Sequence, residues 1–139
     1  MRYSNMTYPR LIFTTQNSPN YLEGNDYSDN DLVNIPKSTV TLNLELSEVT
    51  DAGLEKLPEL DNLICIDLDG TKITDNGLKH LLKIKSIKEI WIEQTEITNQ
   101  GLLFLKDLPS LEFISVLDTQ ITEDGINHFL KLCPGVEVH

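Results

Sequence analysis

Apolar residues recur along most of the chain in a pattern that combines two periods. In the stretch LICIDLDGTKITDNGLKHLLKIKS, which begins at Leu63, they first alternate with polar residues and then recur every three or four positions. Alternation is typical of a β-strand, and the longer spacing is typical of an amphipathic helix. One strand and one short helix cannot bury two apolar faces alone. The pattern therefore predicts a unit that is stable only when it stacks against similar units.

The same pattern occurs four times without gaps, at a constant spacing of 24 residues. The copies begin at Thr39, Leu63, Ile87 and Leu111, and a fifth starts at Gly135. The alternating strand positions are apolar in all four copies: Leu42 and Leu44, Ile66 and Leu68, Ile90 and Ile92, Ile114 and Val116. Such self-similarity is the signature of a solenoid, so we predict strand–helix units stacked in a row.

A threonine precedes the helical part of every copy, and a glycine follows it three residues later. Thr74 stands before Asp75, and Thr122 stands before Glu123. We expect these threonines to be helix N-caps whose hydroxyls accept a hydrogen bond from a backbone N–H. The acids that follow would face the positive end of the helix.

The repeated unit, LICIDLDGTKITDNGLKHL from Leu63 to Leu81, resembles the leucine-rich repeat family. It is most similar to the ribonuclease-inhibitor and F-box-type branch and to small bacterial proteins with I-T-D-x-G-L repeats. The resemblance covers residues 39–139. It implies an α/β solenoid with a parallel sheet on the concave side and short helices on the convex side, and a binding surface rather than a chemistry.

One column departs from the family pattern. The family's usual Asn or Cys at the turn after the strand is replaced by hydroxyl residues: Ser47, Thr71, Thr95 and Thr119. A hydroxyl still bonds to the backbone of such a turn. We expect the side-chain ladder in this turn to be weaker than in the family.

Residues 1–38 fall outside the repeat spacing and are expected to form an N-terminal capping segment before the repeats of residues 39–139. They hold all four tyrosines and both arginines. Residues 10–15 are predicted to be a strand, residues 16–30 a loop, and Leu32 and Ile35 the end of a degenerate first repeat. A solenoid needs its open end shielded, which favours a cap. The alternative is an arm that also touches the partner.

The chain has 11 Lys and Arg against 22 Asp and Glu, a net charge of −11. This sign argues against nucleic acid and against an anionic membrane surface as partners, and it suits a basic protein. No apolar run approaches the roughly 18 residues of a membrane span. The first fifteen residues lack the apolar core of a secretion signal. Cys65 and Cys133, expected to be unpaired, suit a reducing compartment. We therefore expect a cytoplasmic protein, most simply a monomer.

Known catalytic and cofactor motifs are missing from the sequence, and the three histidines lie far apart. We expect a protein that is not an enzyme and has no cofactor or metal. One pattern keeps an enzyme alternative open, because Asp67, Asp69 and Glu93 could hold Mg²⁺ or Ca²⁺. The further ligands of a calcium loop are missing.

The strand positions on the side opposite the predicted core form three rows across the repeats. They are Thr41, Cys65, Glu89, Phe113 and Glu137; Asn43, Asp67, Trp91, Ser115 and His139; and Glu45, Asp69, Glu93 and Leu117. These rows contain no Lys or Arg. Like charges stacked on adjacent strands repel. An acidic ladder beside an exposed Trp91 is therefore typical of a binding face for a basic partner.

We predict a non-enzymatic protein-binding module, either an immunity or antitoxin protein or an adaptor. The predicted partner-binding residues are Glu45, Asp67, Asp69, Glu89, Trp91, Glu93 and Phe113. Trp91 would be the exposed anchor, so its loss should cost the fold little. A merely solvated acidic surface is the plainer interpretation of the same charges. The alternative function is a structural subunit that docks, or dimerises, through an uncapped C-terminal edge at residues 136–139.

Overall fold

The computed structural model of the chain describes residues 20–139. Six strands form one sheet in sequence order, and every neighbouring pair is parallel. The strands are β1 (Tyr21–Glu23), β2 (Thr41–Asn43), β3 (Cys65–Asp67), β4 (Glu89–Trp91), β5 (Phe113–Ser115) and β6 (Glu137–Val138). The predicted α/β solenoid with adjacent parallel strands is confirmed.

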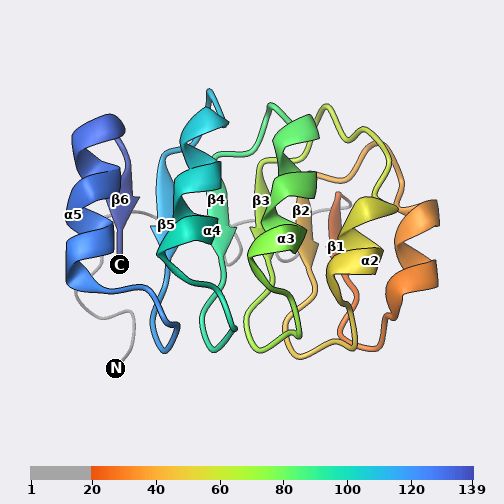
Figure 1. Ribbon diagram of the computed structural model, residues 1–139. Coiled ribbons are helices and arrows are strands. Elements are labelled where there is room, and N and C mark those ends of the chain that lie inside the picture. Colours follow the sequence, from red (N-terminus) through yellow and green to blue (C-terminus); the bar gives the residue numbers. More distant parts are fainter. Residues whose placement is uncertain (1–19) are drawn as a thin grey trace.

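Short helices connect the strands and all lie on one side of the sheet (Figure 1). They are η1 (Asp29–Asn34), α2 (Asp51–Glu55), α3 (Asp75–Leu78), η2 (Lys79–Lys83), α4 (Asn99–Phe104), η3 (Leu105–Asp107) and α5 (Glu123–Leu132). Within residues 20–139, none of these helices has the length and apolar character needed to cross a bilayer.

The main core lies between the sheet and the helices. Ile66 pairs with Ile90, and Ile90 pairs with Ile114, so the inward strand positions stack directly on one another. They pack with the helical leucines, such as Leu78 and Leu102, in one cluster of buried side chains. The regular columns of the sequence thus become continuous layers of apolar side chains, as expected when neighbouring repeats complete each other's core.

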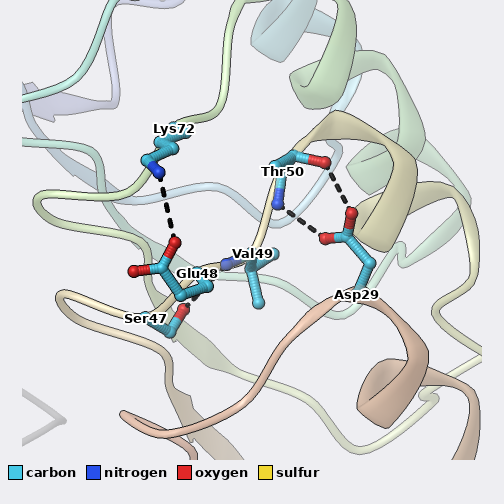
Figure 2. Close-up of polar contacts among 6 residues, drawn as sticks. All are labelled: Asp29, Ser47, Glu48, Val49, Thr50 and Lys72. Carbon is cyan, nitrogen blue, oxygen red and sulfur yellow. Dashed lines mark hydrogen bonds and ion pairs between the residues drawn. The ribbon is translucent and has the colours of Figure 1, made fainter.

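A polar bridge also joins each helix start to the next. The carboxylate of Asp29 accepts hydrogen bonds from the N–H and the hydroxyl of Thr50, both at 2.7 Å (Figure 2). Asp51 does the same for Thr74, and Asp75 for Thr98. At the fourth junction the side-chain oxygen of Asn99 accepts from the Thr122 N–H, and its amide donates to the Thr122 hydroxyl. We call these contacts the Asp–Thr bridges.

The bridges explain the glycine in every copy. A Cβ added at Gly77 would collide with Oδ1 of Asp51, and one at Gly101 would collide with Oδ1 of Asp75. Gly53 and Gly125 meet the same obstacle from the bridging residue of the preceding repeat. The glycine is therefore required by close approach, because the carboxylate of one repeat occupies the space of a side chain in the next.

The capping role predicted for the threonines is confirmed at Thr122, whose hydroxyl accepts from the N–H of Gly125 at 3.1 Å. It is wrong at Thr74, which makes no side-chain cap of this kind. The Thr74 hydroxyl donates its proton to Asp51 at 2.5 Å. A charged acceptor in the previous repeat makes a stronger hydrogen bond than a local backbone donor.

The hydroxyl column after the strands bonds to its own turn, as predicted. Thr71 donates to the carbonyl of Leu68 at 2.7 Å, and Thr95 donates to the carbonyl of Ile92 at 2.6 Å. The residue that immediately precedes each hydroxyl residue of the column has a left-handed backbone. The φ angles are 60° at Leu46, 67° at Gly70, 56° at Gln94 and 58° at Asp118. The turn is thus the same in four repeats although only one of them has glycine there.

The solenoid extends further toward the N-terminus than the sequence indicated. The loop predicted for residues 16–30 contains β1, which pairs with β2, and the first residues of η1. Leu32 and Ile35 belong to the main core, as expected for a degenerate first repeat. The strand predicted for residues 10–15 lies outside the described residues. The capping role of residues 1–38 stays a prediction, although the sheet continues across the predicted boundary at residue 39.

Candidate functional site

The sheet face opposite the helices, which we call the concave face, carries the rows that the sequence predicted. Strand register aligns Thr41, Cys65, Glu89 and Phe113 in one row. A second row runs through Asn43, Asp67, Trp91 and Ser115. The backbone carbonyls of the third row continue the ladder, because the carbonyl of Asp69 accepts from the N–H of Leu46 and the carbonyl of Glu93 accepts from the N–H of Gly70. The predicted binding residues are therefore brought together on one face.

Their predicted exposure, however, is wrong. Trp91, Phe113 and Glu89 are 0% exposed, and Glu93 is 1% exposed. Asp67 and Asp69 are each 2% exposed, whereas Glu45 at the edge is half-buried. Strand alternation determines which face a side chain occupies, but it does not determine whether that face meets water. Trp91 therefore does not stand free as an anchor in this chain.

The concave aromatic residues are buried separately from the main core, whose apolar cluster includes neither Trp91 nor Phe113. Their rings lie 5.0 Å apart, and the ring of His139 lies 5.3 Å from that of Phe113. The indole N–H of Trp91 donates to Oε1 of Glu89 at 2.5 Å. The burial of indole and carboxylate together is consistent with this bond, because a buried polar group is costly without a partner.

The acids of the concave face make hydrogen bonds along and across the strands. Oδ1 of Asp67 accepts from the N–H of Asp69 at 2.9 Å, and Oδ1 of Asp69 accepts from the N–H of Glu93 at 2.7 Å. Glu93 accepts a short hydrogen bond from the hydroxyl of Ser115. Asp67 and Asp69 thus also fix the ends of the strands, a structural role that the charge pattern alone did not reveal.

Comparison with solved structures finds the same architecture in a leucine-rich repeat protein of Leptospira interrogans. The match has a TM-score of 0.54 and 17% sequence identity, and it covers 75% of this chain and 27% of that one. This chain has the leucine-rich repeat fold. An internalin of Listeria monocytogenes is also similar, with a TM-score of 0.48, 14% identity, and 73% and 34% of the two chains covered.

This chain spans about a quarter to a third of the length of those two proteins. At the level of sequence, no family model matches it and no curated protein is similar to it. The likeness therefore establishes the fold, and the function has to be argued from the concave face itself.

Tyr21 is a member of the site that sequence reasoning missed. It pairs with Thr41 and so begins the row that leads to Cys65 and Glu89. Its hydroxyl accepts from the side-chain amide of Asn43 at 2.8 Å. Burial raises the pKa of Tyr21, and this hydrogen bond opposes the rise. The available signal was the Tyr21-Leu22-Glu23 alternation, which lies off the 24-residue spacing.

The enzyme alternative places a metal ion among Asp67, Asp69 and Glu93. Throughout residues 20–139, no group of three or more His, Cys, Asp or Glu side chains is arranged to hold a metal ion. Asp67 and Asp69 each use one oxygen to accept a backbone N–H.

A hollow lies along the rim of the sheet where the strands begin. It has a volume of about 600 Å³ and is lined in part by one repeat column, Ser38, Asn62, Ser86 and Ser110. Ser86 donates to the carbonyl of Leu63 at 2.6 Å, and the amide of Asn62 lies 3.4 Å from the carbonyl of Lys37. These polar groups join neighbouring repeats, so the rim has a structural explanation.

Proposed function

We propose that this chain is a non-enzymatic protein-binding module whose concave face binds a basic segment of a partner protein. One observation carries the proposal: a buried layer of acidic and aromatic side chains lies on the sheet face opposite the main core. The repeats are already held together by their helix-side core and by the Asp–Thr bridges. The carboxylates on the other face stack on adjacent strands, and a basic segment is complementary to them in charge.

The chemistry of the face defines the segment that it suits. Trp91 and Phe113 offer adjoining rings on which apolar side chains and the guanidinium group of arginine pack. Glu89 and Glu93 flank these rings with carboxylates, which pair with arginine in a favourable two-point geometry. An extended strand-like segment with alternating arginine and apolar residues would meet both features at once.

Within this class, an immunity protein that masks a basic toxin and an adaptor that recruits a basic partner use the face in the same way. The identity of the partner distinguishes the two roles. The alternative role is a structural subunit that docks through the edge of the sheet at β6.

The test uses synthetic peptides of equal length that are basic and apolar, acidic and apolar, or neutral and polar, with binding to the full chain measured by calorimetry. We expect only the basic peptide to bind. Glu93→Lys should weaken its binding at least about tenfold, as expected for a charge at the centre of an interface. Glu48→Lys is the matched control, because Glu48 is 73% exposed and pairs with Lys72 away from the concave face.

Two results would contradict the proposal. One is equal binding of the basic and acidic peptides. The other is an equal loss in Glu93→Lys and Glu48→Lys, since that would show a general effect of net charge rather than recognition by the concave face.

A further inference from the structure

The second copy of the repeat differs from the others in the residue that precedes its glycine. The dipeptide Asn76-Gly77 lies in the first turn of α3 and occurs once in the sequence. The other copies have Ala52-Gly53, Gln100-Gly101 and Asp124-Gly125 at the equivalent positions. The glycine is common to all four because the bridging side chain of the preceding repeat fills the space of a Cβ. The second copy alone therefore combines this required glycine with an asparagine.

An asparagine followed by glycine loses its side-chain amide without an enzyme. The backbone nitrogen of Gly77 attacks Cγ of Asn76, the bond from Cγ to the side-chain nitrogen breaks, and the N–H proton leaves with that nitrogen as ammonia. One water molecule then opens the cyclic imide at either of its two carbonyls, which gives aspartate or isoaspartate at position 76. Glycine favours the first step because it has no side chain beside the attacking nitrogen and its backbone turns freely.

The folded chain restrains this reaction. The side chain of Asn76 is exposed, but Gly77 is buried, and its N–H donates to the carbonyl of Thr74 at 2.9 Å. Thr74 is held in turn by Asp51, which accepts from its N–H at 2.7 Å and from its hydroxyl at 2.5 Å. The equivalent bridge of the preceding junction is drawn in Figure 2. The nitrogen of Gly77 reaches Cγ of Asn76 only when this first turn of α3 opens.

We propose that Asn76 is a site of spontaneous deamidation whose rate is controlled by the bridge between Asp51 and Thr74. While the bridge is closed, the nitrogen of Gly77 stays in the first turn and the amide survives. When the bridge opens, the turn loses its anchor, because α3 has only four residues and no side-chain cap from Thr74. Elements held by few contacts open locally at a small cost in free energy. The inference goes beyond the proposed function and does not depend on it.

The two products have different consequences for the array. Aspartate fits, because Asp124 has the equivalent position before Gly125 in α5. Isoaspartate adds a methylene group to the backbone and displaces the glycine that follows it. Gly77 has no room for this displacement, since a Cβ on it would already collide with Oδ1 of Asp51. Isoaspartate therefore prevents the bridge from closing again, so that one opening event becomes a permanent change at this junction.

The test measures deamidation at Asn76 over time by mass spectrometry of proteolytic peptides from the full chain. A synthetic peptide of residues 70–82 is the unfolded reference. We expect Asn76 to react at least about tenfold more slowly in the chain than in the peptide. Asp51→Ala should raise the rate in the chain about tenfold, which corresponds to about 1.4 kcal/mol less protection of the turn. An unchanged rate in Asp51→Ala would overturn the proposal, as would equal rates in the chain and the peptide.

Two variants separate the bridge from charge and from general stability. Asp51→Asn removes the same charge but should keep most of the protection, because Asn99 forms the equivalent bridge with an amide at the fourth junction. Asn99→Ala removes a bridge two junctions away and should leave the rate at Asn76 unchanged. Amide exchange in β3 and β4 should stay slow throughout, which shows that the sheet remains folded. An equal rise in Asn99→Ala and Asp51→Ala would mean that overall stability, and not this bridge, controls the site.

The products are tested separately after ion-exchange chromatography of the aged chain. Asn76→Asp is the matched aspartate form, and its Thr74 and Gly77 N–H groups should exchange as slowly as in the unchanged chain. In the isoaspartate fraction the same two N–H groups should exchange at least about tenfold faster. Slow exchange in both forms would show that the junction accommodates the added methylene group, and the permanent opening of the bridge would then be wrong.

Discussion

The sheet face that packs against the helices carries the same kind of side chain in every repeat, whereas the concave face carries a different one in each. Ile66, Ile90 and Ile114 stack on the helix side. The concave row beside them reads Cys65, Glu89 and Phe113. Both faces are buried. The comparison teaches that uniform columns hold the repeats together in one apolar core, whereas the irregular columns form a second buried layer outside that core.

The sharpest way to break this comparison is to truncate neighbouring residues of β4 that point to opposite faces. Ile90→Ala should lower the free energy of unfolding by about 2–5 kcal/mol, because it leaves a cavity in the main core. Trp91→Ala should lower the free energy of unfolding by less, despite the larger ring. Trp91 lies outside the main apolar cluster, so its loss destabilises only the concave layer and leaves the main core intact. Chemical denaturation of both variants measures the difference. An equal or larger loss in Trp91→Ala would show that the two faces form one cooperative core.

The Asp–Thr bridges predict a strong coupling on the helix side. Gly77→Ala should destabilise the chain by about 1–3 kcal/mol, because the new Cβ displaces the Asp51 carboxylate from Thr74 and leaves the Thr74 N–H without its acceptor. Asp51→Ala should cost a similar amount. The double variant should lose clearly less than the sum, since the methyl group then enters space that the carboxylate has left. Thermal unfolding of the three variants measures the coupling, and simple additivity would contradict the bridge as the reason for the glycine.

A buried carboxylate of the concave face and an exposed carboxylate elsewhere should also differ in their contribution to stability. Glu93→Gln should cost about 1–2 kcal/mol, because a buried charged acceptor of the Ser115 hydroxyl becomes a neutral one. Glu48→Gln should change stability by less than about 0.5 kcal/mol, because its pair with Lys72 is exposed. Urea unfolding at low and high salt separates the two. Equal values would mean that the concave acids are no more than surface charges.

The smallest effect concerns the turn that both faces share. Gln94→Gly should stabilise the chain by about 0.5–1 kcal/mol, because Gln94 has a φ of 56° that favours glycine. Gly70→Ala, at the equivalent turn, should destabilise it, since an added Cβ would lie 2.5 Å from Cδ2 of Leu46. Paired thermal unfolding measures both. A stabilising Gly70→Ala would show that this turn relaxes away from its left-handed backbone.

Most of the fold was readable from the sequence because 24-residue spacing places equivalent side chains in register. The first repeat escaped this reasoning for a physical cause. β1 pairs Tyr21 with Thr41, twenty positions later, whereas β2 pairs Thr41 with Cys65, 24 positions later. A shorter connection preserves the strand pairing and the Asp29 bridge while breaking the spacing. A search for periodicity finds only repeats of equal length. Stacking requires only that the strands and helices of neighbouring repeats adopt the same geometry.

The position of the candidate site could be predicted from the sequence, but the burial of its side chains could not. Alternation placed Trp91 and Glu93 on the concave face, and the register agrees. Their burial is a separate property, which alternation within a strand does not encode. The role of Gly77 was hidden for a related reason, because the atom that forbids its side chain belongs to Asp51 in another repeat. Contacts between neighbouring repeats cannot be inferred from the sequence pattern of one repeat alone.

The Asp–Thr bridges have a consequence for how such a chain changes length. Residues 51–74 begin with a bridge acceptor, Asp51, and end with a bridge donor, Thr74. After a tandem duplication of this stretch, the original Asp51 would still meet the original Thr74, and the copied Asp would meet the copied Thr, so that every junction is satisfied. The glycine inside the stretch is copied with it and leaves room for the added carboxylate. Gene duplication could therefore extend the array by whole copies, with no compensating substitution at the joints.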